Sequence, residues 1–208
     1  MENFIFDLEK EIGSRKFLLK IRTENGWNLM QCAAKGGNSK IFEIITKEMK
    51  DCQMKSEKTY DQMTVLHIAA KYGRYNICKR ILKKDDYNFL NDTSMQGKNA
   101  CHYAAEGGFI DVLELLIEKK VDARAITEIG QNIFHIACIY NHEDTCMCRY
   151  ISNSTQFHDL LSAECADGWN ATLHAAKNGH KNILNFLLGI NVSFNHSSES
   201  KRTALHIA

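Results

Sequence analysis

One ten-residue pattern recurs along the chain and limits its fold more than any other feature. The clearest copy is residues 64–73, with the sequence TVLHIAAKYG. More divergent copies occupy residues 28–37, 99–108, 132–138, 170–179 and 203–208. Each copy places a small residue at the same point: Ala33, Ala69, Ala104, Ala137, Ala175 and Ala208. These alanines are 36, 35, 33, 38 and 33 residues apart, and a period of this length predicts a solenoid of stacked units.

Each copy contains the signals that begin and end a short helix. A residue whose side-chain oxygen can accept a backbone N–H bond, worth about 1 kcal/mol, precedes the helix. These residues are Asn28, Thr64, Asn99, Asn132, Asn170 and Thr203. Glycines that tolerate a left-handed backbone follow it at Gly37, Gly73, Gly108 and Gly179. A second apolar run comes next, with three- to four-residue spacing that places its side chains on one helix face. The predicted unit is a helix, a tight turn, a second helix and a long turn.

These residues resemble the core of the ankyrin repeat, Gly-x-Thr-Pro-Leu-His-x-Ala-Ala-x-x-Gly, from about residue 25 to residue 208. The resemblance implies an all-α solenoid of stacked helix-turn-helix units with turn or hairpin connections. Residues 1–24 are expected to form a degenerate N-terminal repeat or cap, since a solenoid end needs a cover for its apolar face. The repeats are predicted near residues 25–60, 61–95, 96–128, 129–166 and 167–199, with a truncated unit at 200–208. Because the chain stops within a first helix, we expect it to be a fragment of a longer protein.

Several positions depart from the family pattern. Proline is absent from the whole chain. Gln31 replaces the family histidine in the first repeat, and in the fifth repeat Leu173 fills that place with His174 beside it. The fourth repeat has Asn141 in place of glycine and Thr145 with Cys146 in place of the usual aliphatic pair. We therefore expect the fourth repeat to be the least stable unit.

Two connections are longer than a minimal repeat. Residues 47–61 are polar and are expected to extend a helix and then form a loop. Residues 152–165 carry Phe157, Leu160 and Leu161, which are enough for one extra helical turn packed on the array. Neither connection has the composition of a linker between domains.

Composition limits the environment and the partners. The net charge is +1, from 26 Lys+Arg against 25 Asp+Glu, so the sequence predicts no nucleic-acid partner and no direct membrane contact. The N-terminus lacks a basic start followed by an apolar run, and no apolar stretch approaches the roughly 18 residues of a membrane span. The eight cysteines fall mostly inside apolar patterns, as Cys78 does. A reducing, cytoplasmic compartment is therefore expected.

No arrangement of residues predicts catalysis. In the family that the chain resembles, the repeated histidine bridges backbone groups across the turn and to the next repeat. The histidines at this position are therefore interpreted as structural: His67, His102, His135 and His206. The sequence contains no phosphate-binding glycine loop and no Gly-x-Ser-x-Gly elbow. We expect a protein that is not an enzyme and has no cofactor.

One cluster of histidine and cysteine residues has the composition of a metal site. It contains His135, Cys138, His142, Cys146 and Cys148, with Cys165 downstream. A zinc site usually has a Cys-x-x-Cys pair answered by a second pair, and this cluster lacks that spacing. The repeat pattern already accounts for His135 and Cys138, and Cys146 and Cys148 diverge on a helix. The sequence therefore predicts no metal site.

A partner-binding surface is the remaining functional feature. In ankyrin proteins, partners usually lie along the concave face formed by turn tips and the exposed side of the first helices. The matching positions here are Trp27, Lys35, Met63, Lys71, Tyr72, Lys98, Glu106, Gln131, Ile139, Tyr140, Trp169, Lys177 and Asn178. Both tryptophans occupy the same turn-tip position, and aromatic residues often anchor interfaces. Packing of both tryptophans against neighbouring turns is an equally good interpretation.

The function predicted from these features is binding of a partner protein or peptide along the concave face. An alternative is that the chain is the cytosolic N-terminal ankyrin region of a TRP-type cation channel, a family whose members carry such arrays. A third is a regulatory array fused to a catalytic domain such as a kinase or a ubiquitin ligase. The residues that follow Ala208 would separate these alternatives.

Overall fold

The computed structural model describes residues 21–48, 57–83, 89–141, 146–194 and 197–207, and all regular structure among them is helical. The α-helices are α3 (Leu29–Gly36), α4 (Ser39–Glu48), α6 (Val65–Lys71), α7 (Tyr75–Ile81), α8 (Ala100–Gly107), α9 (Ile110–Glu118), α10 (Ile133–Tyr140), α11 (Cys146–Asn153), α12 (Ala171–Lys177), α13 (Lys181–Gly189) and α14 (Ala204–Ile207). Two 3₁₀ helices, η3 (Thr155–Leu161) and η4 (Ala166–Gly168), follow α11. The prediction of an all-α stack of helix pairs is confirmed, whereas most of the predicted cap at residues 1–24 lies outside the described residues.

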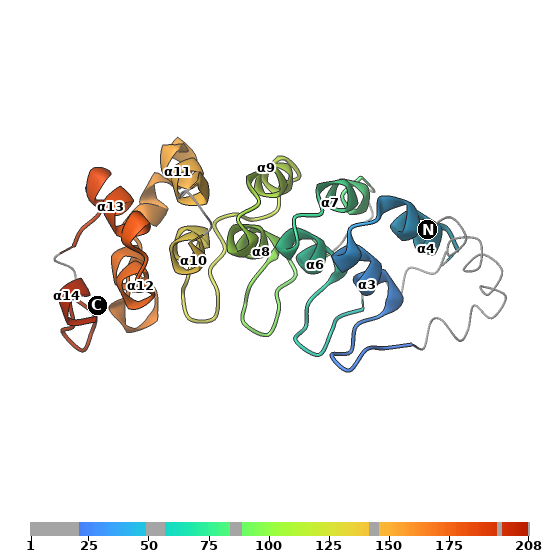
Figure 1. The fold of residues 1–208 in the computed structure, drawn as a ribbon, viewed down its shortest axis with the longest axis horizontal. Helices are drawn as coiled ribbons and strands as arrows, with labels where there is room; N and C mark the ends of the chain where they lie inside the picture. The colour runs from blue at the N-terminus through green and yellow to red at the C-terminus, as the bar shows by residue number, and fades with distance from the viewer. Residues whose placement is uncertain (1–20, 49–56, 84–88, 142–145, 195–196, 208) are drawn as a thin grey trace.

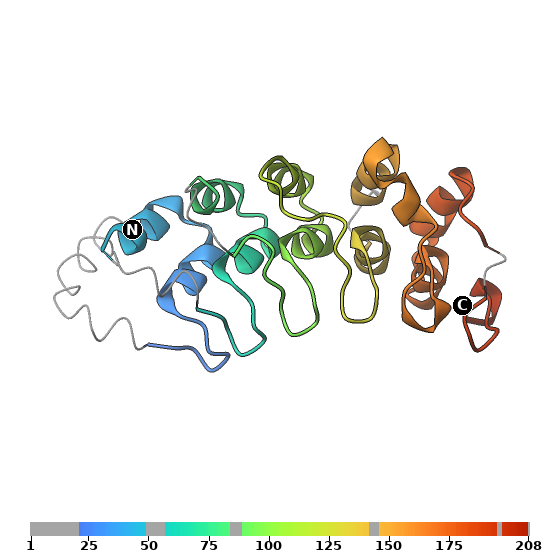
Figure 2. The same cartoon turned by 180° about the vertical axis from the view of Figure 1, so that it is seen from behind.

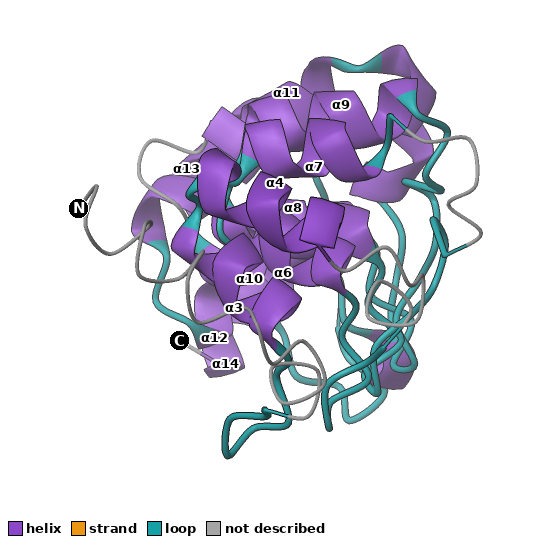
Figure 3. Cartoon of the chain, turned by 90° about the vertical axis from the view of Figure 1, so that its right-hand side faces the viewer, coloured by secondary structure: helices purple, strands orange, loops and turns teal. Residues whose placement is uncertain are grey.

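The helices form two parallel rows (Figure 1). The first helix of each unit, here called the inner helix, lies in one row as α3, α6, α8, α10, α12 and α14. The second, or outer, helix lies in the other row as α4, α7, α9, α11 and α13. The same rows are seen from behind in Figure 2, and a view along the stack places the loops on one side of the helices (Figure 3). Each unit packs mainly on its two neighbours, as in other solenoids.

The predicted capping residues start the inner helices. The side chains of Asn28, Thr64, Asn99, Asn132 and Asn170 all accept a backbone N–H bond from the third residue of the helix that follows. The oxygen-to-nitrogen distance is 2.9 Å for Asn28 and 3.3 Å for Thr64. An inner helix of seven or eight residues is too short to be stable alone, so these caps and the packing between units hold it.

The repeated histidines link each unit to the next. In His67, Nδ1 accepts the backbone N–H of Thr64 at 3.1 Å, and Nε2–H donates to the carbonyl of Asp92 at 2.9 Å in the following connection. His102 and His135 make the same pair of bonds, to the carbonyls of Gln131 and Ala163. Each ring therefore joins a helix start to the neighbouring hairpin.

In the first repeat Gln31 makes the two hydrogen bonds that a histidine makes in the next three units. Its Oε1 accepts the backbone N–H of Asn28 at 2.8 Å, and its Nε2 donates to the carbonyl of Glu57 at 2.9 Å. In the fifth repeat Leu173 is fully buried in the histidine place, and the link changes. There Asn170 Nδ2 and Thr172 Oγ1 both donate to the carbonyl of Ser193, at 3.3 and 3.2 Å.

The outer helices and the connection after α11 complete the core. Ile77 and Leu113 are fully enclosed between the rows, as the apolar periodicity predicted. In η3 the side chains of Phe157, Leu160 and Leu161 are buried, which confirms the extra helical turn expected in residues 152–165. The inserted turn therefore adds to the apolar core beside α10 and α11.

A phenylalanine fits between two glycines where the second and third units meet. A Cβ on Gly73, which has φ +64°, would lie 2.4 Å from the ring of Phe109. A Cβ on Gly107 would lie 2.5 Å from the same ring and 2.6 Å from the carbonyl oxygen of Lys71. Both glycines are therefore required by the close approach of the units, and Gly73 also by its left-handed backbone.

The loops between units end in tight hairpin tips. The tips span residues 23–27, 59–63, 94–98, 127–131, 165–169 and 198–202, and each is closed by a backbone hydrogen bond between its first and fifth residues. Three further backbone bonds join neighbouring tips: Met95 N–H to Asp61 at 3.0 Å, Glu128 N–H to Gln96 at 3.1 Å and Ala166 N–H to Ile129 at 2.8 Å. Four successive tips are thus connected through main-chain atoms.

The buried histidines make stability depend on pH. Burial lowers the pKa of His102 to about 4, against 6.5 for an exposed histidine. The folded state therefore favours the neutral ring. The stability from this group is present above pH 6.5 and is lost as pH falls from 6.5 to about 4.

We predict that His102→Gln keeps both hydrogen bonds, as Gln31 does, and removes this pH dependence. The variant should lose less stability than the wild type between pH 6.5 and 4, by up to about 3 kcal/mol. Urea unfolding followed by circular dichroism at several pH values measures the difference. If the free energy of unfolding of the variant fell with pH as steeply as that of the wild type, the pH dependence would not come from His102.

The helix-ending residue of the fourth repeat offers a second prediction. Asn141 has φ 38° and ψ 63°, a left-handed conformation that costs asparagine more than glycine. Asn141→Gly should therefore stabilise the chain by roughly 0.5–1 kcal/mol. Asn178 ends α12 with φ −92°, so the matched change Asn178→Gly should destabilise it slightly. Thermal unfolding of both variants compares the two effects, which should have opposite signs.

Candidate functional site

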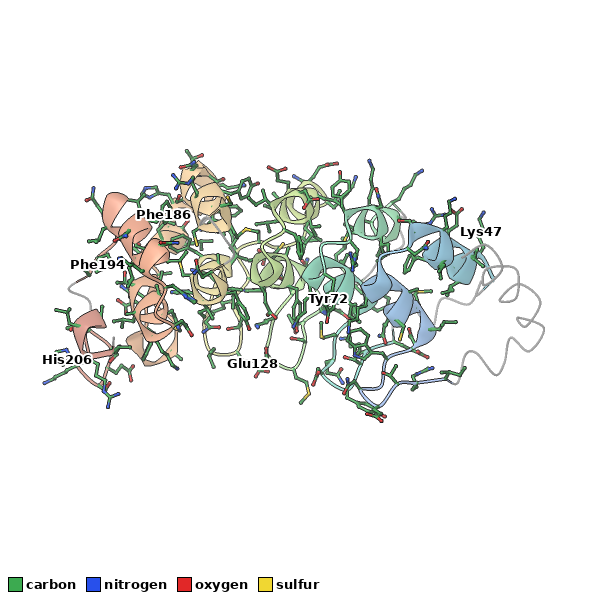
Figure 4. The ribbon with its side chains drawn as sticks, viewed as in Figure 1. Lys47, Tyr72, Glu128, Phe186, Phe194 and His206 are labelled. Carbon is green, nitrogen blue, oxygen red and sulfur yellow. The ribbon has the colours of Figure 1, made fainter. Side chains whose placement is uncertain are left out.

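The thirteen residues predicted to bind a partner lie at the hairpin tips and along the ends of the inner helices. We call this surface the inner face. Lys35, Tyr140, Lys177 and Asn178 are exposed, and Trp27, Lys71, Tyr72, Ile139 and Trp169 are half-buried. Met63, Lys98, Glu106 and Gln131 are buried. In Figure 4 Tyr72 lies where α3 meets α6, and Glu128 marks a hairpin tip below the inner helices.

A three-residue ionic network occupies the middle of the inner face. Glu106, at the end of α8, contacts Lys71 of α6 through Oε1 at 2.7 Å. Its Oε2 lies 2.6 Å from Nζ of Lys98, which stands at a hairpin tip. Lys98 and Glu106 are each only 7% exposed. A buried lysine needs a partner of opposite charge, and Glu106 supplies it.

Burial and charge act in opposite directions on these groups. Burial alone raises the pKa of Glu106, but hydrogen bonds from Lys71 and Lys98 outweigh it, so the pKa lies below its ordinary value. Burial lowers the pKa of Lys71, and its bond to Glu106 raises the pKa above its ordinary value. Lys71 and Glu106 therefore stay charged at neutral pH.

Two tyrosines pack against the same lysines. The ring of Tyr103 lies 5.6 Å from Nζ of Lys71 and 5.8 Å from Nζ of Lys98. Nζ of Lys98 is also 5.3 Å from the ring of Tyr140 and 3.5 Å from its hydroxyl. Cation–π contacts of this kind contribute more when they are removed from water, as Lys98 is. Tyr140 remains 42% exposed and presents its ring to solvent.

The two tryptophans form similar contacts at the ends of the inner face. Lys35 Nζ lies 5.3 Å from the ring of Trp27 and 5.3 Å from the ring of Tyr72. Lys177 Nζ lies 5.4 Å from the ring of Trp169. Each tryptophan is half-buried, so it packs on its unit and also leaves part of the ring accessible. Both interpretations of the tryptophans therefore describe part of their environment.

The other predicted residues contribute mainly to the framework. Met63 and Gln131 are buried at the hairpin tips, and the carbonyl of Gln131 accepts from His102. The carbonyl of Ile139 accepts from Nε2 of His180 at 2.8 Å. Asn178 donates from Nδ2 to the carbonyl of His174. The accessible part of the inner face is therefore formed chiefly by lysine and aromatic side chains.

Tyr103 was missed by the sequence analysis, although it contacts both central lysines. It stands between His102 and Ala104 and was treated as part of the repeat pattern. The opposite charges of Lys71 and Glu106, which share one repeat position in adjacent units, could have revealed the ionic network. Neighbouring units bring equal positions side by side, so a charge reversal at one position predicts a contact.

The described residues offer little metal-binding or nucleophilic chemistry. Among them no group of three histidine, cysteine, aspartate or glutamate side chains is arranged to hold a metal ion. In the cluster considered above, His142 lies outside the described residues, and the Nε2 of His135 donates to Ala163. Cys138 and Cys148 face each other at 3.7 Å with both thiols buried, whereas Cys146 is exposed. Burial raises the pKa of the Cys138 thiol well above its ordinary value, which keeps it protonated.

None of the described helices has the length and apolar character that crossing a membrane requires.

The comparison with known families identifies the class of protein. A family model described as ankyrin repeats (three copies) matches residues 10–91 and 85–148. These residues are more than half of the chain, and with the stacked helix pairs they show that the chain belongs to the ankyrin-repeat family, whose repeats are a protein-binding module. Neither the matched family nor the described residues indicate a catalytic domain within this chain.

Individual relatives are distant. The chain is 28% identical over 135 residues to tyrosine-protein kinase HTK16 of Hydra vulgaris. This match covers 64% of the present chain and 17% of the kinase. It is 40% identical over 63 residues to the human transient receptor potential cation channel subfamily A member 1, covering 30% of this chain and 6% of the channel. The chain thus spans a minor part of these relatives.

A solved structure shows the same fold. It is a chain of the complex of the Bd0816 predatory endopeptidase from Bdellovibrio bacteriovorus with immunity protein Bd3460. The TM-score is 0.68 at 20% sequence identity, and the match covers 90% of this chain and 91% of that chain.

The central network provides a prediction about stability. Glu106→Gln should leave Lys71 and Lys98 without their shared anion, and losing one member of a buried pair costs about 3 kcal/mol. Glu118→Gln is a matched control, because Glu118 is exposed on α9 and, within the described part of the chain, forms an ion pair only with the partly exposed Lys119. That change should cost less than about 0.5 kcal/mol. Equal urea midpoints for the two variants would show that Glu106 does not hold the network.

Proposed function

We propose that this chain is a non-enzymatic interaction module that binds a partner protein or peptide through the inner face, which corresponds to the concave face of an ankyrin array. The observation that carries the proposal is the series of lysine–aromatic contacts along one face of successive units. Aromatic and cationic side chains held in fixed positions lose little freedom on binding, so they favour affinity.

The rigidity of the framework supports this function. The inner helices α3, α6, α8, α10 and α12 are capped, and hydrogen bonds link each of these five to the connection that follows its unit. An extended surface with fixed side chains suits recognition of an extended segment. The fold match to a chain from an endopeptidase–immunity protein complex is in keeping with a binding role.

A binding selection tests the proposal. We predict that peptides selected on the chain from a random display library lose affinity about tenfold or more with Tyr72→Ala or Tyr140→Ala, as expected for aromatic anchors. Glu114→Ala is the control, because Glu114 is exposed on the outer helix α9. It should leave binding unchanged. Ligands that respond to Glu114→Ala and not to the tyrosine variants would contradict the proposal.

A second proposal concerns the larger protein to which such an array would belong. The 40% identity over 63 residues to a cation channel favours the cytosolic ankyrin region of a TRP-type channel. The longer match, to a tyrosine kinase, favours an array that regulates a catalytic domain. Sequencing the transcript beyond the codon for Ala208 distinguishes them, since the channel requires apolar spans and the kinase its catalytic motifs.

A further inference from the structure

The two ends of the inner face carry the same pair of side chains. Trp27 and Trp169 each directly precede the capping residue of an inner helix, and Lys35 and Lys177 each stand two residues after the first small alanine. In both places the ammonium group lies over the tryptophan ring, at 5.3 and 5.4 Å. We call these the N-terminal and C-terminal end pairs. Trp27 and Trp169 are the only tryptophans of the chain.

The end pairs differ from the middle of the face in charge. Lys71 and Lys98 share the carboxylate of Glu106, which neutralises one of their two charges. Among the described residues no carboxylate lies within ion-pair distance of Lys35 or Lys177. Both lysines are exposed. Because Lys98 is buried and Lys71 is half-buried and paired, the exposed ammonium groups of the inner face that have no ion pair among the described residues are those of Lys35 and Lys177.

We infer that the inner face binds an extended acidic peptide segment whose carboxylates form two clusters, one at each end pair, with an uncharged stretch between them. This inference rests on the proposed function and specifies its partner. Each cluster would form an ion pair with a lysine whose position the tryptophan ring already fixes. The uncharged stretch would lie over Tyr140 and the central network.

The spacing of the two clusters follows from the packing of the helices. The end pairs belong to α3 and α12, which are separated by four steps along the row of inner helices. Adjacent packed helices lie about 8–10 Å apart, so the end pairs are about 32–40 Å apart. An extended peptide rises about 3.3 Å per residue, which gives a separation of about 10–12 residues between the clusters.

The hairpin tips favour a peptide over a nucleic acid. Glu24, Asp61, Glu128 and Glu199 are exposed at the tips, and only the last tip also carries exposed positive side chains, Lys201 and Arg202, so carboxylates border most of the face. A nucleic acid carries a phosphate at every residue and would meet this acidic border along its length. A peptide with carboxylates only at the two end pairs places none of them beside Asp61 or Glu128, at the middle tips. The whole chain is also nearly neutral, at +1.

Synthetic peptides test the inference on the intact 208-residue chain. The probe is an extended Ser/Thr/Gly peptide with Asp-Glu pairs separated by eleven residues. Its isomer carries both pairs together at one end. We expect the probe to bind more tightly than the isomer by about tenfold or more, because linking two weak contacts raises the effective concentration of the second. Intrinsic fluorescence reports binding, and Trp27→Phe or Trp169→Phe assigns the signal to one end.

Variants of the two lysines provide the matched controls. Lys35→Gln and Lys177→Gln should each reduce the affinity of the probe to that of its isomer, whereas Lys35→Arg and Lys177→Arg should preserve it, since arginine also stacks on aromatic rings. Equal binding of probe and isomer, wild-type affinity in the glutamine variants, or equally tight binding of a 16-nucleotide oligo(dT) would each overturn the inference. Display-selected ligands that need Tyr140 and ignore both lysines would overturn it and leave the proposed function standing. Ligands that ignore every inner-face variant would overturn both.

Discussion

The array depends on one hydrogen-bonded bridge that is repeated between units. A side chain in the first turn of an inner helix accepts a hydrogen bond from the backbone N–H at its own helix start and donates one to a backbone carbonyl of the next connection. Leaving either backbone group unpaired in the interior would cost about 1–3 kcal/mol. In the four units that have it, the bridge therefore fixes the helix start against the neighbouring unit, whereas Asn170 and Thr172 make the link in the fifth. Gln31 makes it with an amide and His67 with an imidazole, so geometry and not ring chemistry is what the position requires.

This bridge also determines where the inner face can vary. The first residues of α6, α8 and α10 are enclosed, whereas the last residue or two of several inner helices reach the surface, as Lys35, Tyr140 and Lys177 do. Along the inner face, lysine and aromatic side chains of neighbouring units contact one another. In the proposed function, the enclosed first residues of an inner helix provide stability and its exposed last residues contact the partner.

Much of the fold could be predicted from the sequence, because periodic requirements leave periodic residues. The caps, the left-handed glycines, the apolar faces of the outer helices and the buried turn at Phe157 all follow from local patterns. The candidate site was less predictable. Lys98 and Glu106 were expected on the surface by their positions, yet the structure buries them because they neutralise each other within one unit, and Lys71 adds a second ion pair to Glu106 from the preceding unit. The repeat pattern shows which positions are equivalent, but it does not show which neighbouring side chains meet.

The bonds between hairpin tips have a consequence for how the recognition surface can evolve. They join main-chain atoms, so the side chains of Met95, Glu128 and Ala166 take no part in them. Mutation at these sites can change the side chains at the hairpin tips while the backbone bonds between neighbouring tips are kept. The backbone arrangement of the tips can therefore stay the same while their side chains change, so the surface chemistry can evolve without a change of fold.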